Sequence, residues 1–331
     1  MAGGKERLLR RRIKSVESTK KITKAMELIA ASRIVKAQQR VAAARPYSEQ
    51  ITEVIRSLAA GGADLSHPLL HQPEQVSTVA YVVITADRGL AGAYNSNVIR
   101  ATERDLRDER DKGRQYRLIL LGRKAESYFR FRGYDIASSF SGMSEQPAYE
   151  DAREVAEAVT EPFLEGEVQL VKLVYTQFLS ASSQRVSVRQ FMPLDAEAIT
   201  EAAEAGQDGP QAVYEFEPEP GQILARLLPR YVEARLFAAM LDAAASEHAA
   251  RQRAMKSATE NAEELIVKLS RVMNRARQDA ITTEIMEIVG GAEALRQARA
   301  GGVDYLPDTL VSRDVLPDQI DPYRTSGAKR R

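Results

Sequence analysis

The 331-residue chain contains no cysteine, no tryptophan and only 3 histidines. The absence of cysteine excludes disulfide bonds, thiolate metal sites and cysteine nucleophiles. No run of about 18 apolar residues occurs, so we expect no segment that spans a membrane. The basic start MAGGKERLLRRR lacks the apolar stretch that follows in a signal peptide. We therefore expect the chain to stay on the cytoplasmic side.

Glycine is missing from two long stretches, about 5–60 and 222–289, and each holds one interior proline, Pro46 or Pro229. Within both stretches apolar residues recur alternately every three and four residues, which predicts long helices with a heptad seam. The first seam comprises Leu9, Ile13, Val16, Lys20, Thr23, Glu27, Ala30, Ile34, Ala37, Val41, Ala44, Ser48, Ile51, Ile55 and Leu58. The second comprises Leu227, Tyr231, Ala234, Ala238, Leu241, Ala245, His248, Gln252, Met255, Thr259, Ala262, Ile266, Leu269, Met273, Ala276 and Ala280.

These helices would measure about 80 Å and about 100 Å at 1.5 Å per residue, so both must protrude from a compact domain. Pairing the two seams buries their apolar side chains. The first helix enters the middle of the chain and the second leaves it, so the pair is expected to be antiparallel. The first seam has a polar gap from Lys20 to Glu27, and Met26 lies off the seam within this gap. We expect Met26 to point away from the packed side.

The middle of the chain alternates between apolar strand patterns and amphipathic helix patterns, as in a small doubly wound sheet with mixed edges. Strands are expected in VSTVAYVVITA, YRLILLG, GYDIASSF, VQLVKLVYTQF and QRVSVRQFMPL. The predicted fold class is a long antiparallel two-helix coiled coil, formed by the N- and C-terminal helices, with a small Rossmann-like α/β domain between them. The expected segments are a coiled-coil helix at 1–60, a linker at 61–75, the α/β domain at 76–192, an acidic linker at 193–221, a coiled-coil helix at 222–296 and a disordered tail at 297–331.

Charge is unevenly distributed, although the chain carries a net charge of only +1. Residues 1–40 hold twelve Lys or Arg against three Glu, whereas residues 193–221 hold eight acids and no base. This asymmetry indicates either different partners for different parts of the chain or a solvated helix face with a polar loop.

The segment DRGLAGAYNSN (87–97) follows an apolar strand, where a nucleotide-binding loop often lies. It has Gly89 and Gly92 but neither the third glycine of a dinucleotide loop nor the lysine of a phosphate loop. Positive φ angles at a strand-to-helix turn, with Asn95 or Ser96 as the helix cap, explain it better. Asp87 and Arg88 are candidate catalytic residues, but a local ion pair at the turn is the preferred interpretation.

The histidines do not form a convincing site. His67 and His71 are four residues apart, but neighbouring prolines disfavour a helical metal face, and no third ligand is evident. His248 lies on the second seam, where it is expected to be packed or to face a partner. No metal, cofactor or catalytic residue is therefore predicted.

Two other classes of function stay open on the residues alone. The α/β middle allows a nucleotide-binding enzyme, and basic stretches such as KERLLRRRIK allow a nucleic-acid-binding coiled-coil protein. The basic stretches lack aromatic residues for base stacking, and an acidic protein partner explains them equally well.

Four motifs carry a resemblance that covers nearly the whole chain. They are KKITKAMELIAAS (20–32), ITADRGLAGAYNSN (84–97), RYVEARLFAAMLDAAASEHAARQRAMKSATENA (230–262) and ARQDAITTEIMEIVGGAEAL (276–295). In this order they resemble the gamma subunit family of F-type ATP synthases, whose architecture is an antiparallel coiled coil of both termini with a Rossmann-like middle domain.

The resemblance implies a central rotor shaft that couples proton flow to ATP synthesis or hydrolysis. Its partners would be the hexameric ring of alternating alpha and beta subunits, the epsilon subunit and the membrane-embedded c-ring. It implies no cofactor, no catalytic residue, no nucleic acid and no direct membrane span. The chain would be a peripheral protein at the cytoplasmic face of the cell membrane.

The resemblance also implies roles for individual residues. Contacts with the catalytic ring are expected at Lys24, Met26, Arg251, Gln278 and Thr282. An apolar sleeve would surround the tip formed by Ile281, Ile285, Ile288 and Val289. Glu217 would face the c-ring and epsilon. Family members commonly end near GGAEAL, whereas this chain continues for about 35 residues.

Overall fold

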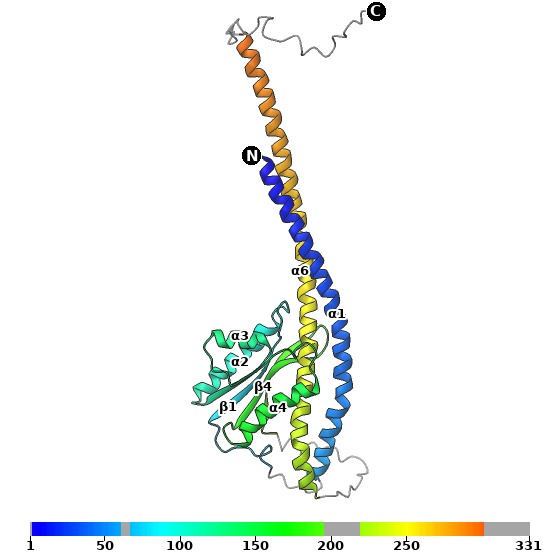
Figure 1. The fold of residues 1–331 in the computed structure, drawn as a ribbon, viewed down its shortest axis with the longest axis vertical. Coiled ribbons are helices and arrows are strands. Elements are labelled where there is room, and N and C mark those ends of the chain that lie inside the picture. The colour runs from blue at the N-terminus through cyan, green and yellow to red at the C-terminus, as the bar shows by residue number, and fades with distance from the viewer. Residues whose placement is uncertain (1, 61–66, 195–218, 301–331) are drawn as a thin grey trace, which may run out of the picture. The chain divides into compact units, whose positions relative to one another are not determined.

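A computed structural model describes residues 2–60, 67–194 and 219–300, and their side chains over 4–58, 67–194 and 219–298 (Figure 1). The elements in chain order are α1 (Ala2–Ala60), β1 (Thr78–Ile84), α2 (Tyr94–Asp111), β2 (Gln115–Leu121), α3 (Arg123–Phe131), β3 (Ser138–Phe140), α4 (Tyr149–Leu164), β4 (Leu170–Phe178), β5 (Gln184–Met192) and α6 (Pro220–Ala300). The chain forms two compact units, one of residues 16–265 and one of residues 1–15 with 266–331.

The sheet has the strand order β3-β2-β1-β4-β5. The first four strands are parallel, and β5 runs antiparallel to β4 at the edge. The central strand pairs on both sides, with Val82 opposite Ile119 of β2 and Leu173 of β4. Successive strands step from β1 to β3 on one side, and the chain then returns to the other side of β1. The direction of winding therefore changes between β1 and β4.

Two apolar clusters cover the two faces of the sheet. On one face, Val82 and Leu173 belong to a cluster with Leu58 of α1, Val155 of α4 and Leu236 of α6. On the other face, alternate strand residues pack beneath α2 and α3; this cluster includes Val83, Val98, Leu106, Phe129 and Val174. Because both faces of the sheet are covered, the sequence of the central strand β1 is a nearly continuous run of apolar residues and does not alternate between apolar and polar residues.

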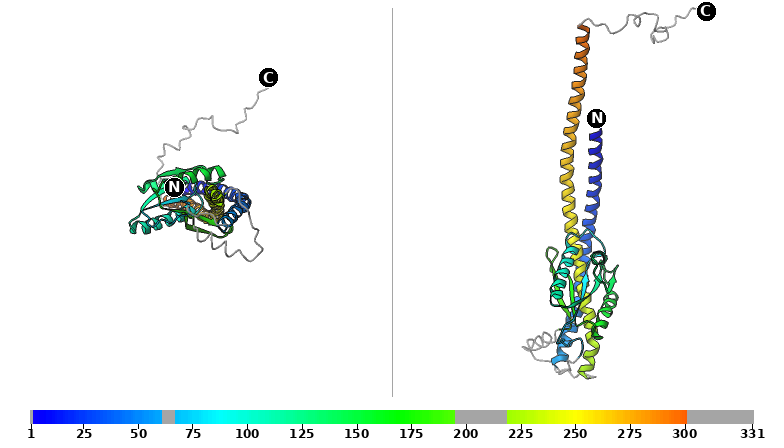
Figure 2. Two further views of the ribbon diagram at one scale, coloured as in Figure 1. Left: turned by 90° about the horizontal axis from the view of Figure 1, so that it is seen from below. Right: turned by 90° about the vertical axis from the view of Figure 1, so that its left-hand side faces the viewer.

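Within residues 16–265, α1 and α6 lie side by side in every view (Figures 1 and 2). Each seam position of α1 from Val16 to Leu58 is buried or partly buried, as is each seam position of α6 from Leu227 to Ala262. Thr23 bonds to Thr259, and Lys20 pairs with Glu263 at 2.6 Å, so residue numbers rise on one helix as they fall on the other. The predicted antiparallel coiled coil and fold class are confirmed.

Off-seam residues of α1 are less buried than most seam residues, but Met26 shares the intermediate burial of the seam residue Glu27, so its predicted orientation stays a prediction. Ile22 and Ile29 are exposed, and Met26 is partly exposed. Many seam residues are alanines, which allows the helices to approach closely.

In the unit of residues 1–15 and 266–331, Leu9 is buried, and Ile13, Ile266 and Met273 are partly buried. Every described side chain from residue 281 to residue 298 is exposed.

Several segment boundaries differ from those expected. The C-terminal helix was expected to end near residue 296, but α6 passes through Gly290 and Gly291 to Ala300. The linker expected at 61–75 includes Leu69 and Leu70, which are buried in the core on the α4 side of the sheet. Residues 61–66, most of the acidic linker (195–218) and the tail from 301 lie outside the described residues.

Candidate functional site: a polar network at the carboxyl edge of the sheet

The turn after β1 is built by backbone conformation rather than by a helix cap. Leu90 and Gly92 have positive φ angles of 64° and 56°. The N-cap of α2 is Ala93, which makes no side-chain cap hydrogen bond. The prediction that Asn95 or Ser96 caps this helix is therefore wrong. Asn95 Oδ1 instead accepts from the amide of Ala86 at 2.8 Å and closes the turn, and the Ser96 hydroxyl donates to the carbonyl of Ala93.

Asp87 joins two loops at this edge. Its carboxylate accepts from the backbone amides of Gly142 at 2.9 Å, Ser144 at 3.3 Å and Arg123 at 3.2 Å. Its own amide donates to Ser144 Oγ at 3.0 Å. The expected ion pair with Arg88 is not the contact that forms. Asp87 Oδ1 instead lies 3.9 Å from Nε of Arg123, at the start of α3.

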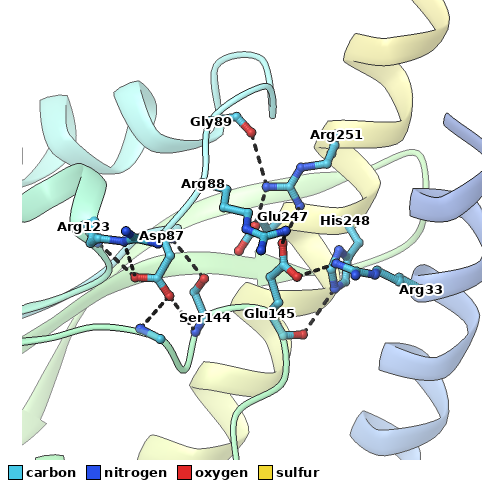
Figure 3. A network of polar contacts seen from close by, with 11 residues as sticks. Arg33, Asp87, Arg88, Gly89, Arg123, Ser144, Glu145, Glu247, His248 and Arg251 are labelled. Carbon is cyan, nitrogen blue, oxygen red and sulfur yellow. Dashed lines mark hydrogen bonds and ion pairs between the residues drawn. The ribbon is translucent and has the colours of Figure 1, made fainter. Parts of the chain in front are cut away.

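Glu145, in the connection between β3 and α4, lies at the centre of the network (Figure 3). Its Oε2 pairs with Arg33 of α1. Its Oε1 lies 3.7 Å from Arg88 Nη1, in the turn after β1, and 3.9 Å from Arg251 Nη1 of α6. The carboxylate of Glu145 therefore interacts with arginines from three separate segments.

The part of the network on α6 is buried. Glu247 is 0% exposed, His248 2% and Arg251 7%. Arg251 Nη2 donates to Glu247 Oε1 at 2.6 Å and to the carbonyl of Gly89 at 3.3 Å. His248 Nε2 lies 3.2 Å from the carbonyl oxygen of Glu145. Three buried atoms, Glu247 Oε2, His248 Nδ1 and Arg251 Nη1, have no hydrogen-bond partner among the described residues.

Burial dominates the titration of these groups. It raises the pKa of Glu247, and the guanidinium of Arg251 only partly opposes this effect. It lowers the pKa of His248, so the neutral imidazole is favoured. The network therefore depends on each charge keeping its partner, because an unpaired buried charge is costly.

The arrangement holds segments of the chain together through ion pairs and backbone hydrogen bonds. The carboxylate of Asp87 accepts from backbone amides, and that of Glu145 faces arginines. Within the described ranges no three His, Asp, Glu or Cys side chains are grouped as metal ligands. His67 Nδ1 accepts from the amide of Leu69 at 3.2 Å, which gives that side chain a local structural role.

The residues expected at partner contacts fall in both units of the chain. Lys24 is exposed and pairs with Glu27 at 3.2 Å, and Met26, two residues further along α1, is partly exposed. Arg251, by contrast, is buried among groups of the chain itself. Gln278 and Thr282 are exposed on α6, in the unit that contains the chain ends. The roles of all five residues as contacts with the catalytic ring stay predictions.

The expected tip residues are all exposed. Ile281, Ile285, Ile288 and Val289 have exposed fractions of 45%, 54%, 72% and 58%. Glu217 lies outside the described residues.

Sequence reasoning missed Glu145, Glu247 and Arg33. One signal was available for the buried pair on α6, because Glu247 and Arg251 have the four-residue spacing that places opposite charges together on a helix. Glu145 lies in an irregular connection and carries no local signal. Its partners come from residues up to 112 positions away.

Known proteins are similar to the chain over most of its length. The family model described as ATP synthase matches residues 5–295. The ATP synthase gamma chain of Parafrankia sp. is 53% identical over 296 residues, which are 88% of this chain and 98% of that one. The ATP synthase gamma chain of Streptomyces coelicolor is 46% identical over 303 residues, which are 90% of this chain and 99% of that one.

Solved structures show the same fold at low sequence identity. One is from the OSCP/F1/c-ring of the Euglena gracilis mitochondrial ATP synthase, with a TM-score of 0.61 at 18% identity, covering 92% of this chain and 99% of that one. Another is from the central stalk/c-ring of the Tetrahymena thermophila mitochondrial ATP synthase, with a TM-score of 0.53 at 24% identity, covering 72% of this chain and 99% of that one.

Proposed function

Because the chain belongs to the ATP synthase gamma chain family, we propose that it is the central rotor shaft of a membrane-bound F-type ATP synthase. In this role it couples proton flow through the membrane ring to ATP synthesis or hydrolysis on the catalytic ring by rotation. Family membership favours this role over a nucleotide-binding enzyme or a nucleic-acid-binding protein.

One observation carries the mechanical part of the proposal. Glu145 and its arginines join α1, α6 and the turn after β1, so the α/β domain is fastened to both helices of the coil. A shaft must turn as one body with the domain that receives the torque. The buried Arg251 of α6 also donates to the carbonyl of Gly89 in the turn after β1, which adds a contact between the coil and the domain.

The proposed partners are the alternating alpha/beta ring, the epsilon subunit and the c-ring. No helix in the described ranges is both long and apolar enough to pass through a membrane. We assign the chain to the cytoplasmic face of the cell membrane as a peripheral subunit. It contributes no catalytic residue, and an off-axis shaft acts by favouring a different state of each catalytic subunit at each angle.

Contacts with the ring are proposed for exposed residues of both helices. Lys24 presents a positive charge suited to an acidic loop, and Met26 follows two residues further along α1. The apolar tip supports the sleeve proposal, because Ile285, Ile288 and Val289 are more than half exposed on one helix. Leaving such side chains in water is unfavourable by roughly 25 cal/mol per Å² of apolar surface, so a covering partner is expected.

Rotation can be tested directly, because the chain has no cysteine and accepts a single introduced label. Ser182 lies in the exposed connection between β4 and β5, and Ser182→Cys places a thiol on the α/β domain. A bead attached there, with the assembled complex fixed through its catalytic ring, is expected to turn in one direction when ATP is added. The cysteine-free chain treated in the same way is the control. Hydrolysis by a labelled complex whose bead stays still would contradict the proposal.

A further inference from the structure

The connection between β3 and α4, residues 141–148, contacts both long helices through polar groups of one residue. The carboxylate of Glu145 pairs with Arg33 of α1. The backbone carbonyl oxygen of the same residue lies 3.2 Å from His248 Nε2 of α6 (Figure 3). Glu145 therefore ties the connection to α1 by its side chain and to α6 by its backbone.

The contact with α6 fixes where the imidazole carries its hydrogen. A carbonyl oxygen only accepts hydrogen bonds, so Nε2 of His248 must donate to Glu145. In the neutral ring Nδ1 is then the nitrogen without a hydrogen. His248 is 2% exposed, and Nδ1 has no hydrogen-bond partner among the residues that the structure describes. A second proton therefore enters at a buried atom to which none of these residues offers an acceptor.

The surrounding charges oppose a positive charge on this ring. The charged side chains of the network around it come from four segments and are Arg33 of α1, Arg88 of the turn after β1, Glu145 of the connection, and Glu247 and Arg251 of α6. Three arginines against two glutamates leave a net charge of +1, which protonation of His248 would raise to +2. Burial, with smaller effects of Arg251 and Arg33, lowers the pKa of His248, although Glu145 opposes this.

Of the two sides of this contact, the connection can open at the smaller cost. Every residue of α6 from 231 to 250 is buried or partly buried, so displacing that helix would disrupt the core. Residues 141–148 form no helix or strand, and Gly142 and Gln146 are exposed. Irregular segments with exposed backbone open locally more readily than core helices do. Opening of the connection would admit water to the ring of His248.

We propose that His248 makes the connection a proton-sensitive latch between the α/β domain and the coil. While the imidazole is neutral, Nε2 holds the carbonyl of Glu145, and the carboxylate of that residue pairs with Arg33. When the imidazole takes up a proton, the connection opens, because water then solvates a charge that is otherwise buried beside Arg251 and Arg33. The proposal concerns the chain itself and does not depend on its role as a rotor shaft.

The direction of the pH dependence follows from the two forms of the latch. In the open form His248 has its ordinary pKa of 6.5, and in the closed form its pKa is lower. The open form therefore binds the proton more tightly. The closed latch keeps its full stability above about pH 6.5 and loses stability as the pH falls from there toward the lower pKa. Within this window the ratio of open to closed forms rises by up to ~10-fold per pH unit.

Hydrogen exchange of the full-length chain at about pH 7.5 and about pH 5.5 tests the latch, after correction for the intrinsic pH dependence of exchange. The protection of residues 142–148 is expected to fall about 3–10-fold at the lower pH. The protection of β1 should not fall, because the opening is local. Unchanged protection of residues 142–148, or an equal fall in β1 that indicates global unfolding, would overturn the proposal.

His248→Gln separates the proton from the contact. The glutamine amide can donate to the carbonyl of Glu145 in place of Nε2 but does not titrate, so the protection of residues 142–148 is expected to be the same at both pH values. His71→Gln, at an exposed position outside the network, is the matched control and should keep the pH dependence of the wild type. A fall that persists in folded His248→Gln, or that disappears in His71→Gln, would contradict the assignment.

A second measurement needs no change at position 248. The chain has 3 histidines, so nitrogen NMR of the histidine-labelled protein can be assigned by comparison with His67→Gln and His71→Gln. His248 is expected to carry its hydrogen on Nε2 at neutral pH and to titrate with a midpoint below 6.5. A hydrogen on Nδ1 in the neutral ring, or a midpoint at or above 6.5, would also overturn the proposal.

Discussion

Thr23 of α1 and Thr259 of α6 share a 2.8 Å hydrogen bond between their hydroxyls across the buried seam. Each hydroxyl also lies within hydrogen-bond distance of a carbonyl on its own helix, that of Lys20 at 3.0 Å or that of Met255 at 2.9 Å. A hydroxyl has one proton, so one threonine donates across the seam while the other donates to its own helix. The polar gap in the first seam is therefore closed by a matched polar pair, which fixes the register of the helices.

Replacing one threonine of this pair should destabilise the coil more than replacing both. Thr23→Val is expected to cost about 1–2 kcal/mol, because it leaves the hydroxyl of Thr259 without its partner across the seam. The double variant Thr23→Val/Thr259→Val should cost less than the sum of the single changes. Urea unfolding measures these differences. Thr283→Val, at an exposed helical threonine, is the control. Strictly additive effects would contradict the pairing.

Removing the charge of Arg251 should be among the most damaging changes to the polar network. Arg251→Met leaves the buried carboxylate of Glu247 uncompensated and is expected to cost about 3–5 kcal/mol of unfolding free energy. Arg251→Met/Glu247→Leu should recover part of this loss, because both charges are then absent. Arg271→Met, at an exposed position of α6, is expected to change little. A loss below about 1 kcal/mol in Arg251→Met would show that the pair is not effectively buried.

Asp242 should make stability depend on pH. Burial raises its pKa to about 6 from 3.8, against smaller opposing effects from Arg189 and the backbone of Phe178. The folded state therefore binds the proton more tightly, so this contribution is present below about pH 4 and is lost as the pH rises through 6. Asp242→Asn should raise the melting temperature relative to the wild type above pH 6 and leave it similar at pH 4. Asp108→Asn, at an exposed site, serves as the control, and a pH-independent difference for Asp242→Asn would contradict the prediction.

Gly122 should tolerate no side chain, whereas Gly133 should tolerate one at moderate cost. Both have positive φ, 93° and 74°. A Cβ on Gly122 would lie 2.2 Å from the carbonyl oxygen of Thr85, whereas one on Gly133 would meet nothing within 4 Å. Gly133→Ala should therefore show only the backbone strain of about 1–2 kcal/mol. Gly122→Ala should lose clearly more in thermal unfolding, and similar losses in the two variants would rule out the close contact.

The exposed tip should matter in the assembled complex and not in the isolated chain. Ile288 is 72% exposed, so Ile288→Asp is expected to leave the melting temperature of the free protein within about 1 °C. In an apolar sleeve the same charge is unfavourable, so ATP-driven proton pumping by reconstituted vesicles should fall. The neighbouring change Glu287→Gln is the control. Normal pumping by Ile288→Asp would remove the sleeve from the proposed function.

The coiled coil could be predicted from sequence because its determinants are local and repeated. Leu9, Ala30, Ile34 and Leu58 follow one spacing rule over the whole of α1, and the same rule applies to α6. The strands were likewise recognisable, since a strand covered on both faces leaves a run of apolar residues such as TVAYVVI.

The polar network could not be foreseen in the same way. Asp87 was recognised as a charged residue at a turn. The groups that hydrogen-bond to it, however, belong to residues 123 and 142–144, which are distant in the sequence. Asn95 is a residue type that often caps helices. In the fold its side-chain carbonyl instead accepts from the backbone amide of Ala86. In both cases the side chain's role is decided by segments that only the folded sheet brings together.

The uninterrupted course of α6 has a mechanical consequence. From Tyr231 to Ala249 it is covered on nearly every side as the core of the α/β domain, and from there to Leu265 it is covered along a stripe as one half of the coil. No glycine or proline lies between these two roles. Torsional strain that enters through the domain can therefore travel along one covalent backbone and its ladder of amide bonds, without having to cross a joint between separate parts.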